Sequence, residues 1–226
     1  MIRIKNVHKA YGPNAKVLHD INLNIKAGEF VSLVGQSGTG KTSLVKILIG
    51  EERVTSGQVM VGDWDITKLS KRSVPYLRRQ IGVIFQDFKL LPKKTLYENV
   101  AFALEVCGQK PSKISKIIPS VMKIVGLEGK QHRYPNEVSG GEQQRAAIAR
   151  ALVHQPRILL ADEPTGNLDT INAAEIIDLL LKINKFGTTI ILVTHNRDIV
   201  NQLEKRVITM ENGRVISDQA NGRYLL

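Results

Sequence analysis

One stretch decides the fold of this chain: Gly35-Gln36-Ser37-Gly38-Thr39-Gly40-Lys41-Thr42, followed by Ser43. An apolar run at 30–34 precedes it, as in a buried strand, and apolar residues at helical spacing follow it. A strand, a glycine-rich turn and a helix in this order are typical of a phosphate-binding P-loop. The glycines let backbone N–H groups converge on an anion, and the start of the helix adds partial positive charge.

The side chains of this loop predict a bound nucleoside triphosphate. Lys41 can reach the β- and γ-phosphates, and the Thr42 hydroxyl is a suitable ligand for Mg²⁺. A flexible glycine loop between a strand and a helix is the alternative. Because Gly35, Gly40, Lys41 and Thr42 are all in register, we expect residues 35–43 to bind phosphate groups.

The composition is that of an ordinary folded chain. It has 226 residues, enough for one sizeable core, with 42% hydrophobic and 23% charged residues. The single cysteine, Cys107, excludes an intramolecular disulfide and is interpreted as a small buried side chain. No apolar run approaches the roughly 20 residues that cross a bilayer as a helix.

The net charge of +11 is concentrated in one segment. Residues 68–133 contain 14 Lys or Arg residues and four Asp or Glu residues, and therefore hold +10 of the total. A localised basic face suggests an anionic partner, either a nucleic acid or the inner leaflet of a membrane. A solvated surface without any partner explains the same charge equally well.

The pattern of apolar residues predicts an α/β chain with a helical insert. Period-2 alternation predicts strands within 1–34, and further strands are expected at 57–61, 81–85, 158–161, 190–193, 207–210 and 214–216. Helices are expected at 97–106, 112–125, 139–152 and 171–183. Pro119 lies within the second helix, where it is expected to introduce a kink.

Two adjacent carboxylates, Asp162 and Glu163, follow the buried strand at 158–161. Residues just past the carboxyl end of a strand in an open parallel sheet face the ligand crevice. Asp162 is therefore expected to hold Mg²⁺ through water, and Glu163 to orient and deprotonate the attacking water. The alternative, a polar loop after a strand, does not explain two carboxylates at that edge.

A second anion-binding turn is expected where another helix begins. The residues are Ser139-Gly140-Gly141-Glu142, and the unpaired N–H groups of the helix start can hold a phosphate together with the Ser hydroxyl. Taken alone, this turn is also explained as a simple helix N-cap.

The P-loop, the carboxylate pair and the Ser-Gly-Gly turn together resemble the ATP-binding-cassette (ABC) ATPases, over essentially the whole chain. The resemblance implies an α/β P-loop core with an N-terminal antiparallel β subdomain. It also implies a helical subdomain at about 87–155, within a single domain of residues 1–226. The implied activity is hydrolysis of ATP, with ATP and Mg²⁺ bound together.

Each further motif of the family has a counterpart here, and the resemblance implies its role. Tyr11 matches the aromatic residue that stacks on adenine, Gln86 the glutamine that senses Mg²⁺, and His195 the histidine near the γ-phosphate. Residues 138–142 match the signature sequence, with Val138 and Glu142 in place of the commonest residues. Asp169 belongs to the loop that communicates across a dimer.

The resemblance also implies partners. In this family each ATP lies between the P-loop of one subunit and the signature turn of the other, so two copies are expected to form an ATP-dependent homodimer. Hydrolysis is expected to drive an integral membrane subunit, which places the chain peripherally on the cytoplasmic face of the cell membrane. An anionic lipid surface is a further candidate contact for the basic segment.

Within the family, the cell-division ATPases are the most similar branch. The similarity is carried by residues 85–92, 95–99, 101–106 and 138–150. Their membrane partner regulates cell-wall hydrolases and no cargo is transported. Lipoprotein-releasing and macrolide-exporting ATPases share residues 142–145 and 164–169 but are less similar at 86–91, and they remain the alternative.

Two more distant alternatives are less favoured. A cassette that acts on nucleic acid usually has tandem cassettes, zinc modules or long coiled coils, and none is visible here, so no nucleic acid is expected as a partner. A regulatory module without hydrolysis is disfavoured by Glu163 and His195.

Overall fold

The computed structural model describes residues 1–12 and 15–224, and an antiparallel sheet occupies its N-terminal part. The order in this four-stranded sheet is β2 (Lys16–Ile25), β1 (Ile2–Ala10), β4 (Ser56–Val61) and β5 (Trp64–Asp65). Ile2, Ile4, Ile21 and Ile25 are buried while their polar neighbours are exposed, as the period-2 pattern predicts. Register shifts interrupt the pairing of β1 with β2 between Ile4 and Ala10.

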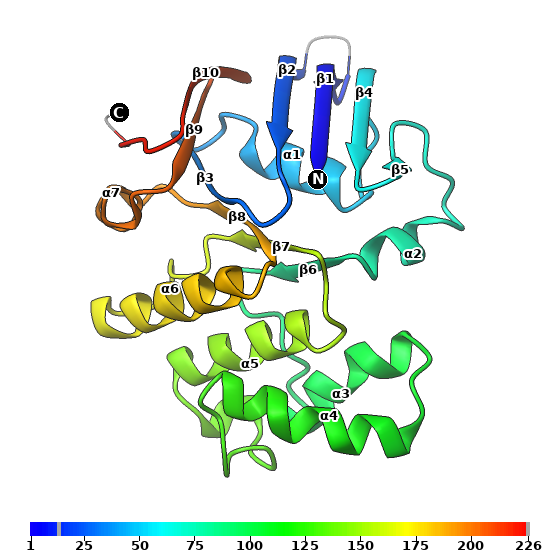
Figure 1. Ribbon diagram of the computed structural model, residues 1–226, viewed down its shortest axis with the longest axis vertical. Helices are drawn as coiled ribbons and strands as arrows, with labels where there is room; N and C mark the ends of the chain where they lie inside the picture. The colour runs from blue at the N-terminus through cyan, green and yellow to red at the C-terminus, as the bar shows by residue number, and fades with distance from the viewer. Residues whose placement is uncertain (13–14, 225–226) are drawn as a thin grey trace.

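A second sheet forms the centre of the molecule (Figure 1). Its order is β10 (Arg214–Gln219), β9 (Arg206–Glu211), β3 (Phe30–Val34), β8 (Thr189–Val193), β7 (Ile158–Asp162) and β6 (Ile81–Ile84). The pairs from β9 to β6 are parallel, and β10 returns antiparallel through the turn at Asn212 and Gly213. Because β3, β7 and β8 are covered on both faces, their residues are almost all buried.

Helix α1 (Lys41–Leu48) joins the two sheets into one core. Leu44, Val45 and Leu48 of α1 belong to the same buried cluster as Ile4 of β1 and Val31 of β3. Figure 1 shows α1 behind the lower ends of β2, β1 and β4, above the level of β7 and β6. The P-loop helix is therefore held by apolar contacts on two sides, which fixes the position of its N-terminus.

Helices cover the other face of the six-stranded sheet. They are α3 (Leu96–Val106), α4 (Pro111–Ile124), α5 (Gly140–Leu152) and α6 (Thr170–Lys185). Figure 1 shows α6 and α5 next to the sheet, with α3 and α4 further away at the bottom of the view. Leu104, Ile118, Ile148 and Ile176, one from each helix, share a single buried cluster.

The α/β fold with an N-terminal antiparallel sheet and a group of helices is confirmed, and the predicted elements lie within a few residues of the observed ones. Short elements were not predicted: α2 (Val74–Arg78), α7 (Arg197–Leu203), β5 and a single 3₁₀ turn at Pro135–Glu137. Helix α4 continues through Pro119, and Cys107 is half-buried where α3 ends. Across the described residues, no helix combines the length and apolar character needed to cross a bilayer.

Candidate functional site

A cavity of about 740 Å³ lies at the carboxyl ends of the parallel strands. Its lining comes from the loops that follow β3, β6, β7 and β8: Gln36, Ser37, Gly38, Gly40, Lys41, Thr42, Ser43, Gln86, Asp162, Glu163 and His195. The structure therefore brings together the P-loop, both carboxylates, the glutamine and the histidine, although these residues are up to 159 positions apart. This is the crevice in which open α/β sheets bind ligands.

Two glycines determine the shape of the P-loop. Gly35 has a φ of 147°, and a Cβ there would lie 2.2 Å from the carbonyl oxygen of Met210. Gly40 is the N-cap of α1 with a φ of 98°, and a Cβ there would lie 2.6 Å from Leu18 Cδ2. A side chain at either position would both strain the backbone and collide with neighbouring atoms, so the loop requires glycine.

Lys41 lies beneath this loop and is 8% exposed. Its ammonium group donates hydrogen bonds to the carbonyl oxygens of Gly35 and Gln36, both at 2.7 Å. Burial lowers the pKa of Lys41, and the negative charges of Glu163 and Asp162 partly oppose this. The cavity thus contains a buried cation at the start of a helix, an arrangement that attracts anions.

Two carboxylates lie close to this cation: Asp162, which ends β7, and Glu163, which follows it. Burial and the adjacent charge of Glu163 raise the pKa of Asp162, while Lys41 and Lys89 oppose the increase. Glu163 has a left-handed backbone, with a φ of 49°, and its N–H donates to the carbonyl oxygen of Val193 at 2.9 Å. Strained conformations of this kind occur at functional sites because the surrounding structure enforces them.

His195 contacts Glu163 directly. Its Nδ1 lies 2.7 Å from Glu163 Oε1, and the carboxylate accepts this hydrogen bond. The histidine side chain is 69% exposed and the glutamate side chain is 16% exposed. The imidazole therefore lies at the mouth of the cavity and orients the glutamate from the solvent side.

Gln86, after β6, is tied to the loop that follows the carboxylates. Its Nε2 donates to Asn167 Oδ1 at 3.4 Å, and Asn167 Nδ2 donates to the Gln86 carbonyl oxygen at 3.0 Å. A Cβ at Gly166 would lie 2.8 Å from Gln86 Nε2, so this approach also depends on a glycine. Movement of Gln86 therefore requires that the loop at 166–167 adjust with it.

Tyr11 lies at the edge of the P-loop. Its hydroxyl is 3.3 Å from Ser43 Oγ, and the residue is 50% exposed. The ammonium of Lys9 lies 4.5 Å from the ring centroid, a cation–π contact that fixes the ring. The residue is therefore half exposed at the edge of the P-loop, and an exposed ring can stack on a planar group.

The signature turn and Asp169 do not line this cavity. Ser139 caps α5: its Oγ accepts from the Glu142 N–H at 3.3 Å, and Glu142 Oε2 accepts from the Ser139 N–H at 2.9 Å. The other oxygen of Glu142 forms an ion pair with Lys130. Asp169 caps α6 through the Asn172 N–H. In a single copy these residues are therefore apart from the P-loop.

Four further residues line the cavity: Val193 ends the predicted strand β8, and the other three belong to no local sequence motif. These three are Val17, Arg197 and Tyr224. Val17 belongs to β2, which pairs in the other sheet, and Tyr224 is a buried residue whose N–H donates to Asn201 Oδ1. Their presence in the cavity results from tertiary packing, which no local motif specifies.

The comparison with protein families identifies the class. Residues 18–166 match the model of the ABC transporter family. This range covers more than half of the chain and includes the P-loop, Gln86, the signature turn and both carboxylates. The chain therefore belongs to the ABC transporter family, and it is an ABC-type ATPase that binds ATP.

Within this family the chain is similar to proteins named cell division ATP-binding protein FtsE. It is 47% identical to FtsE of Bacillus subtilis, over 99% of this chain and 98% of that protein. The identity with FtsE of Mycobacterium tuberculosis is 49% over the same shares, and with FtsE of Escherichia coli it is 41% over 95% and 97%. The predicted similarity to the cell-division branch is confirmed.

Solved structures agree with this assignment. The cassette MJ0796, in a dimer bound to ADP and Pi after hydrolysis, is 34% identical with a TM-score of 0.87 over 99% of this chain and 100% of that one. The subunit cbiO1 of Clostridium perfringens, part of the transporter complex cbiONQ, is 32% identical with a TM-score of 0.90 over 97% and 88%. Cassettes of this family bind ATP and dimerise.

Proposed function

We propose that residues 1–226 form a single ABC ATPase domain, with a helical subdomain at about 87–155, that hydrolyses ATP in the P-loop cavity. One observation carries the proposal: Lys41, Glu163 and His195 lie in one cavity although three different loops supply them. The proposed mechanism gives each of these three side chains a role in binding ATP or in hydrolysing it.

The residues of the cavity suit Mg²⁺ bound together with ATP. Thr42, Gln86 and Asp162 line the cavity and carry side-chain oxygen atoms, and Mg²⁺ prefers oxygen ligands. No group of three His, Cys, Asp or Glu side chains able to hold a metal occurs in the described part of the chain. A few protein oxygens completed by phosphate and water suit Mg²⁺, which rarely binds in a cage made only of protein. When bound, the ion neutralises charge on the phosphates.

Glu163 is the general base in this proposal. Its carboxylate takes a proton from water as the water oxygen attacks the γ-phosphorus and the bond to the ADP oxygen breaks. The hydrogen bond from His195 keeps the carboxylate in one orientation. Lys41 exchanges its loop carbonyl partners for phosphate oxygens, and Tyr11 stacks on the adenine.

The substitution Glu163→Gln tests this role. The amide cannot accept the proton, so turnover should fall about 100-fold or more while ATP affinity is kept. The measurements are phosphate release and equilibrium ATP binding, and gel filtration with ATP should show an accumulated dimer. Glu128→Gln, at an exposed ion pair with Lys123, is the matched control. Turnover of Glu163→Gln near the wild-type level would exclude Glu163 as the base.

In the functional assembly, the signature turn of a second copy completes each site. Residues 139–142 and Asp169 lie outside the cavity of their own chain, so they are available to a partner. Ser139 and the start of α5 then contact the γ-phosphate of the ATP held by the other subunit, and Asp169 contacts the facing copy. ATP therefore holds the homodimer closed, and hydrolysis releases it.

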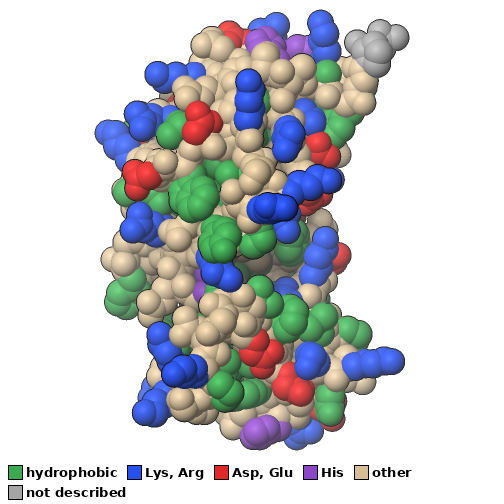
Figure 2. Space-filling model, turned by 90° about the vertical axis from the view of Figure 1, so that its right-hand side faces the viewer, with side chains coloured by type: hydrophobic (Ala, Val, Ile, Leu, Met, Phe, Trp, Pro, Cys, Tyr) green, Lys and Arg blue, Asp and Glu red, His purple; other side chains and the backbone are tan. Residues whose placement is uncertain are grey.

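An FtsX-like integral membrane subunit is the proposed partner, and regulation of cell-wall hydrolysis during cell division the proposed role. The support is the near full-length similarity to FtsE proteins. Figure 2 shows hydrophobic side chains around a hollow on the face that carries α2 and α3. Tyr76, Phe102 and Val106 are exposed apolar residues of these helices. Arg79 links them, because its Nη2 donates to the Val106 carbonyl oxygen and its guanidinium covers the Tyr76 ring.

Co-purification tests the membrane partner. The chain, tagged, should extract an FtsX-like protein in mild detergent, and Phe102→Ser should weaken this while ATPase activity is kept. Ile216→Ser, at an exposed apolar residue of β10, is the control. Recovery of a lipoprotein-releasing or macrolide-type permease would favour the exporter alternative.

The basic segment gives a second, weaker contact with the membrane. Lys71, Arg72 and Lys93 are exposed and form no ion pair with any residue that the structure describes. Arg78, in contrast, donates to the Ile49 carbonyl oxygen. Exposed cations of this kind attract anionic lipid at the cytoplasmic face of the membrane by about 1 kcal/mol each. Binding to anionic and not to neutral liposomes, lost at high salt, is expected, whereas salt-sensitive binding to DNA alone would exclude it.

A further inference from the structure

An apolar groove lies at the amino-terminal ends of the parallel strands. It is therefore at the opposite end of the six-stranded sheet from the P-loop cavity. Its volume is about 950 Å³, and α4, α6 and the turn between α5 and β7 supply most of its walls. Arg157 precedes β7 and Thr189 begins β8, whereas Asp162 ends β7 and His195 follows β8 on the side of the P-loop cavity. The two cavities have no lining residue in common. We call this feature the α4–α6 groove.

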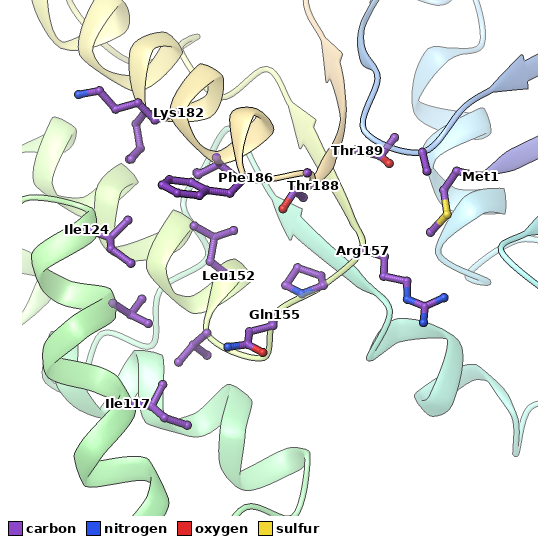
Figure 3. A pocket seen from close by; sticks show the side chains of 17 residues that line it. Met1, Ile117, Ile124, Leu152, Gln155, Arg157, Lys182, Phe186, Thr188 and Thr189 are labelled. Carbon is purple, nitrogen blue, oxygen red and sulfur yellow. The ribbon is translucent and has the colours of Figure 1, made fainter.

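The walls of the α4–α6 groove are apolar and their rims are exposed. Ile117 and Ile124 of α4 face Leu152 and Phe186 across it (Figure 3). Phe186, at the C-terminus of α6, is 90% exposed, and Ile124, at the C-terminus of α4, is 61% exposed. Large apolar side chains gathered around one concave surface are typical of a protein interaction site.

The charges of the groove are all positive. Lys182 and Arg157 line it, and no Asp or Glu does. Neither side chain forms an ion pair or a side-chain hydrogen bond with the residues that the structure describes. Figure 3 places the two residues on opposite sides of the apolar floor. The groove therefore suits an occupant that is apolar in the middle and negatively charged towards both ends.

We propose that the α4–α6 groove binds an amphipathic helix of another protein, with its apolar face on Leu152 and Phe186 and acidic side chains at Lys182 and Arg157. The groove offers mainly side-chain surface and no strand edge, since no residue of the edge strand β6 lines it. A helix satisfies its own backbone hydrogen bonds and binds such surfaces through residues at i, i+3, i+4 and i+7.

Two other occupants fit the groove less well. A second copy of this chain is opposed by charge, because the chain carries +11 and the groove itself contains only cations. A single-chain amphiphile has one anionic head group, which can pair with only one of two cations on opposite sides. An acidic helix carries several carboxylates and can pair with both.

Selection from a helical peptide library tests the proposal without a known partner. Patterned 18-residue peptides, with random apolar residues on one face and random Asp, Glu, Lys or Arg elsewhere, are displayed and selected on the full-length protein. Counter-selection uses the double variant Phe186→Ser with Ile124→Ser, whose changes are at exposed positions and spare the core. We expect enrichment of peptides with Leu, Ile or Phe on one face and Asp or Glu towards both ends.

Affinities of one selected peptide then identify the contacts. Phe186→Ser should weaken binding about 30-fold, as truncation of an aromatic anchor does, and Lys182→Glu about tenfold. A peptide with Lys in place of its acidic residues should bind Lys182→Glu better than it binds the wild type. The controls are Lys185→Glu and Ile216→Ser, which are exposed and outside the groove, and both should bind within about twofold of the wild type.

Three results would overturn the proposal. One is the absence of any groove-dependent enrichment. Another is enrichment of basic or uncharged peptides. The third is displacement of selected peptides by decanoate at micromolar concentration, together with decanoate binding that Lys182→Glu abolishes, because the groove would then be a site for a small amphiphile. ATP hydrolysis should be unchanged in every groove variant, so these outcomes are independent of the proposed ATPase mechanism.

Discussion

Lys41 is a single residue whose charge controls a binding site. Burial lowers its pKa, so the free protein loses this charge at a lower pH than an ordinary lysine, whose pKa is about 10.4. Phosphate groups favour the charged form. ATP affinity should therefore be constant below the lowered pKa and fall as the pH rises through it, towards tenfold per unit. Titration calorimetry from pH 7 to pH 11, a range that includes the ordinary lysine pKa, measures this, and Lys41→Ala should bind very weakly at every pH. A wild-type profile that stays flat over this whole range would contradict the assignment.

Asp162 is a second residue at which function opposes stability. Its pKa is raised by burial and by Glu163, so at neutral pH its ionised form opposes folding. Its carboxylate accepts no hydrogen bond within the described part of the chain. Asp162→Asn should therefore stabilise the nucleotide-free protein by about 1 kcal/mol, as relief at strained functional sites commonly does, while hydrolysis is lost.

The pH dependence of stability shows whether the raised pKa of Asp162 is the reason that Asp162→Asn is more stable. A raised carboxyl pKa costs stability above the folded-state pKa, and the cost disappears as the pH falls towards the ordinary Asp value of about 3.9. The difference in melting temperature between Asp162→Asn and wild type should be present at pH 7 and vanish near pH 4. Asp178→Asn, at an exposed position of α6, should show no such difference. A destabilised Asp162→Asn would contradict this explanation.

For single residues, the sequence was enough to predict those site side chains that belong to a local motif next to a predicted strand. Lys41, Thr42, Asp162 and Glu163 were predicted because the spacing around them is local. The left-handed backbone of Glu163 and its contact with His195 depend on the loop after β8, 32 residues away, so no local pattern reveals them. Tyr224 reaches the cavity through packing alone.

At the scale of elements, the start of α5 illustrates how a loop residue can control a helix terminus. Lys130 pairs with Glu142, whose other oxygen accepts from the Ser139 N–H, so Lys130 acts on the signature turn through Glu142. The same pairing lowers the pKa of Glu142. Lys130 is thus a positioning residue for the proposed composite site.

Lys130→Gln should reduce the turnover of the ATPase severalfold and leave ATP affinity of the single subunit unchanged. The reason is that the turn, which the other subunit uses, becomes less ordered while the P-loop is untouched. Steady-state phosphate release gives the turnover, and ATP binding at low protein concentration gives the affinity. Lys123→Gln, which breaks the similar exposed pair with Glu128, is the control. Lys130→Arg should restore most of the activity, and equal losses in Lys123→Gln would show a general effect of surface charge.

The long helices were predictable because their apolar residues recur over three or more turns, and α3 also begins with the capping residues Thr95 and Glu98. Helices α2 and α7 contain five and seven residues, too few for periodicity to separate them from turns. Pro119 was expected to kink α4. The helix continues through it, because Ile114, Ile118 and Met122 anchor the helix in the core on both sides.

At the scale of the whole molecule, the six-stranded sheet separates two surfaces with different chemistry. The polar P-loop cavity lies at the carboxyl ends of its parallel strands, and the apolar α4–α6 groove lies at their amino-terminal ends. The sequence predicted the first surface because a motif marks each of its loops. It could not predict the second, because the apolar residues of α4 and α6 read as ordinary core positions until packing leaves some of them exposed.

In the proposed head-to-tail dimer, each ATP site combines the P-loop of one copy with the signature turn of the other. Ser139→Arg alters only the signature turn and Lys41→Ala only the P-loop, so each homodimer has two defective sites. In a mixed dimer both defects fall in one site, and the other site is built from two intact elements. An equal mixture should therefore recover up to about one quarter of wild-type turnover, because half of the dimers are mixed and each has one intact site. Phosphate release, with dimer formation followed by light scattering, measures this. If mixed dimers form and remain inactive, then the signature turn does not act across the interface, and a site contained within one subunit would have to replace the composite one.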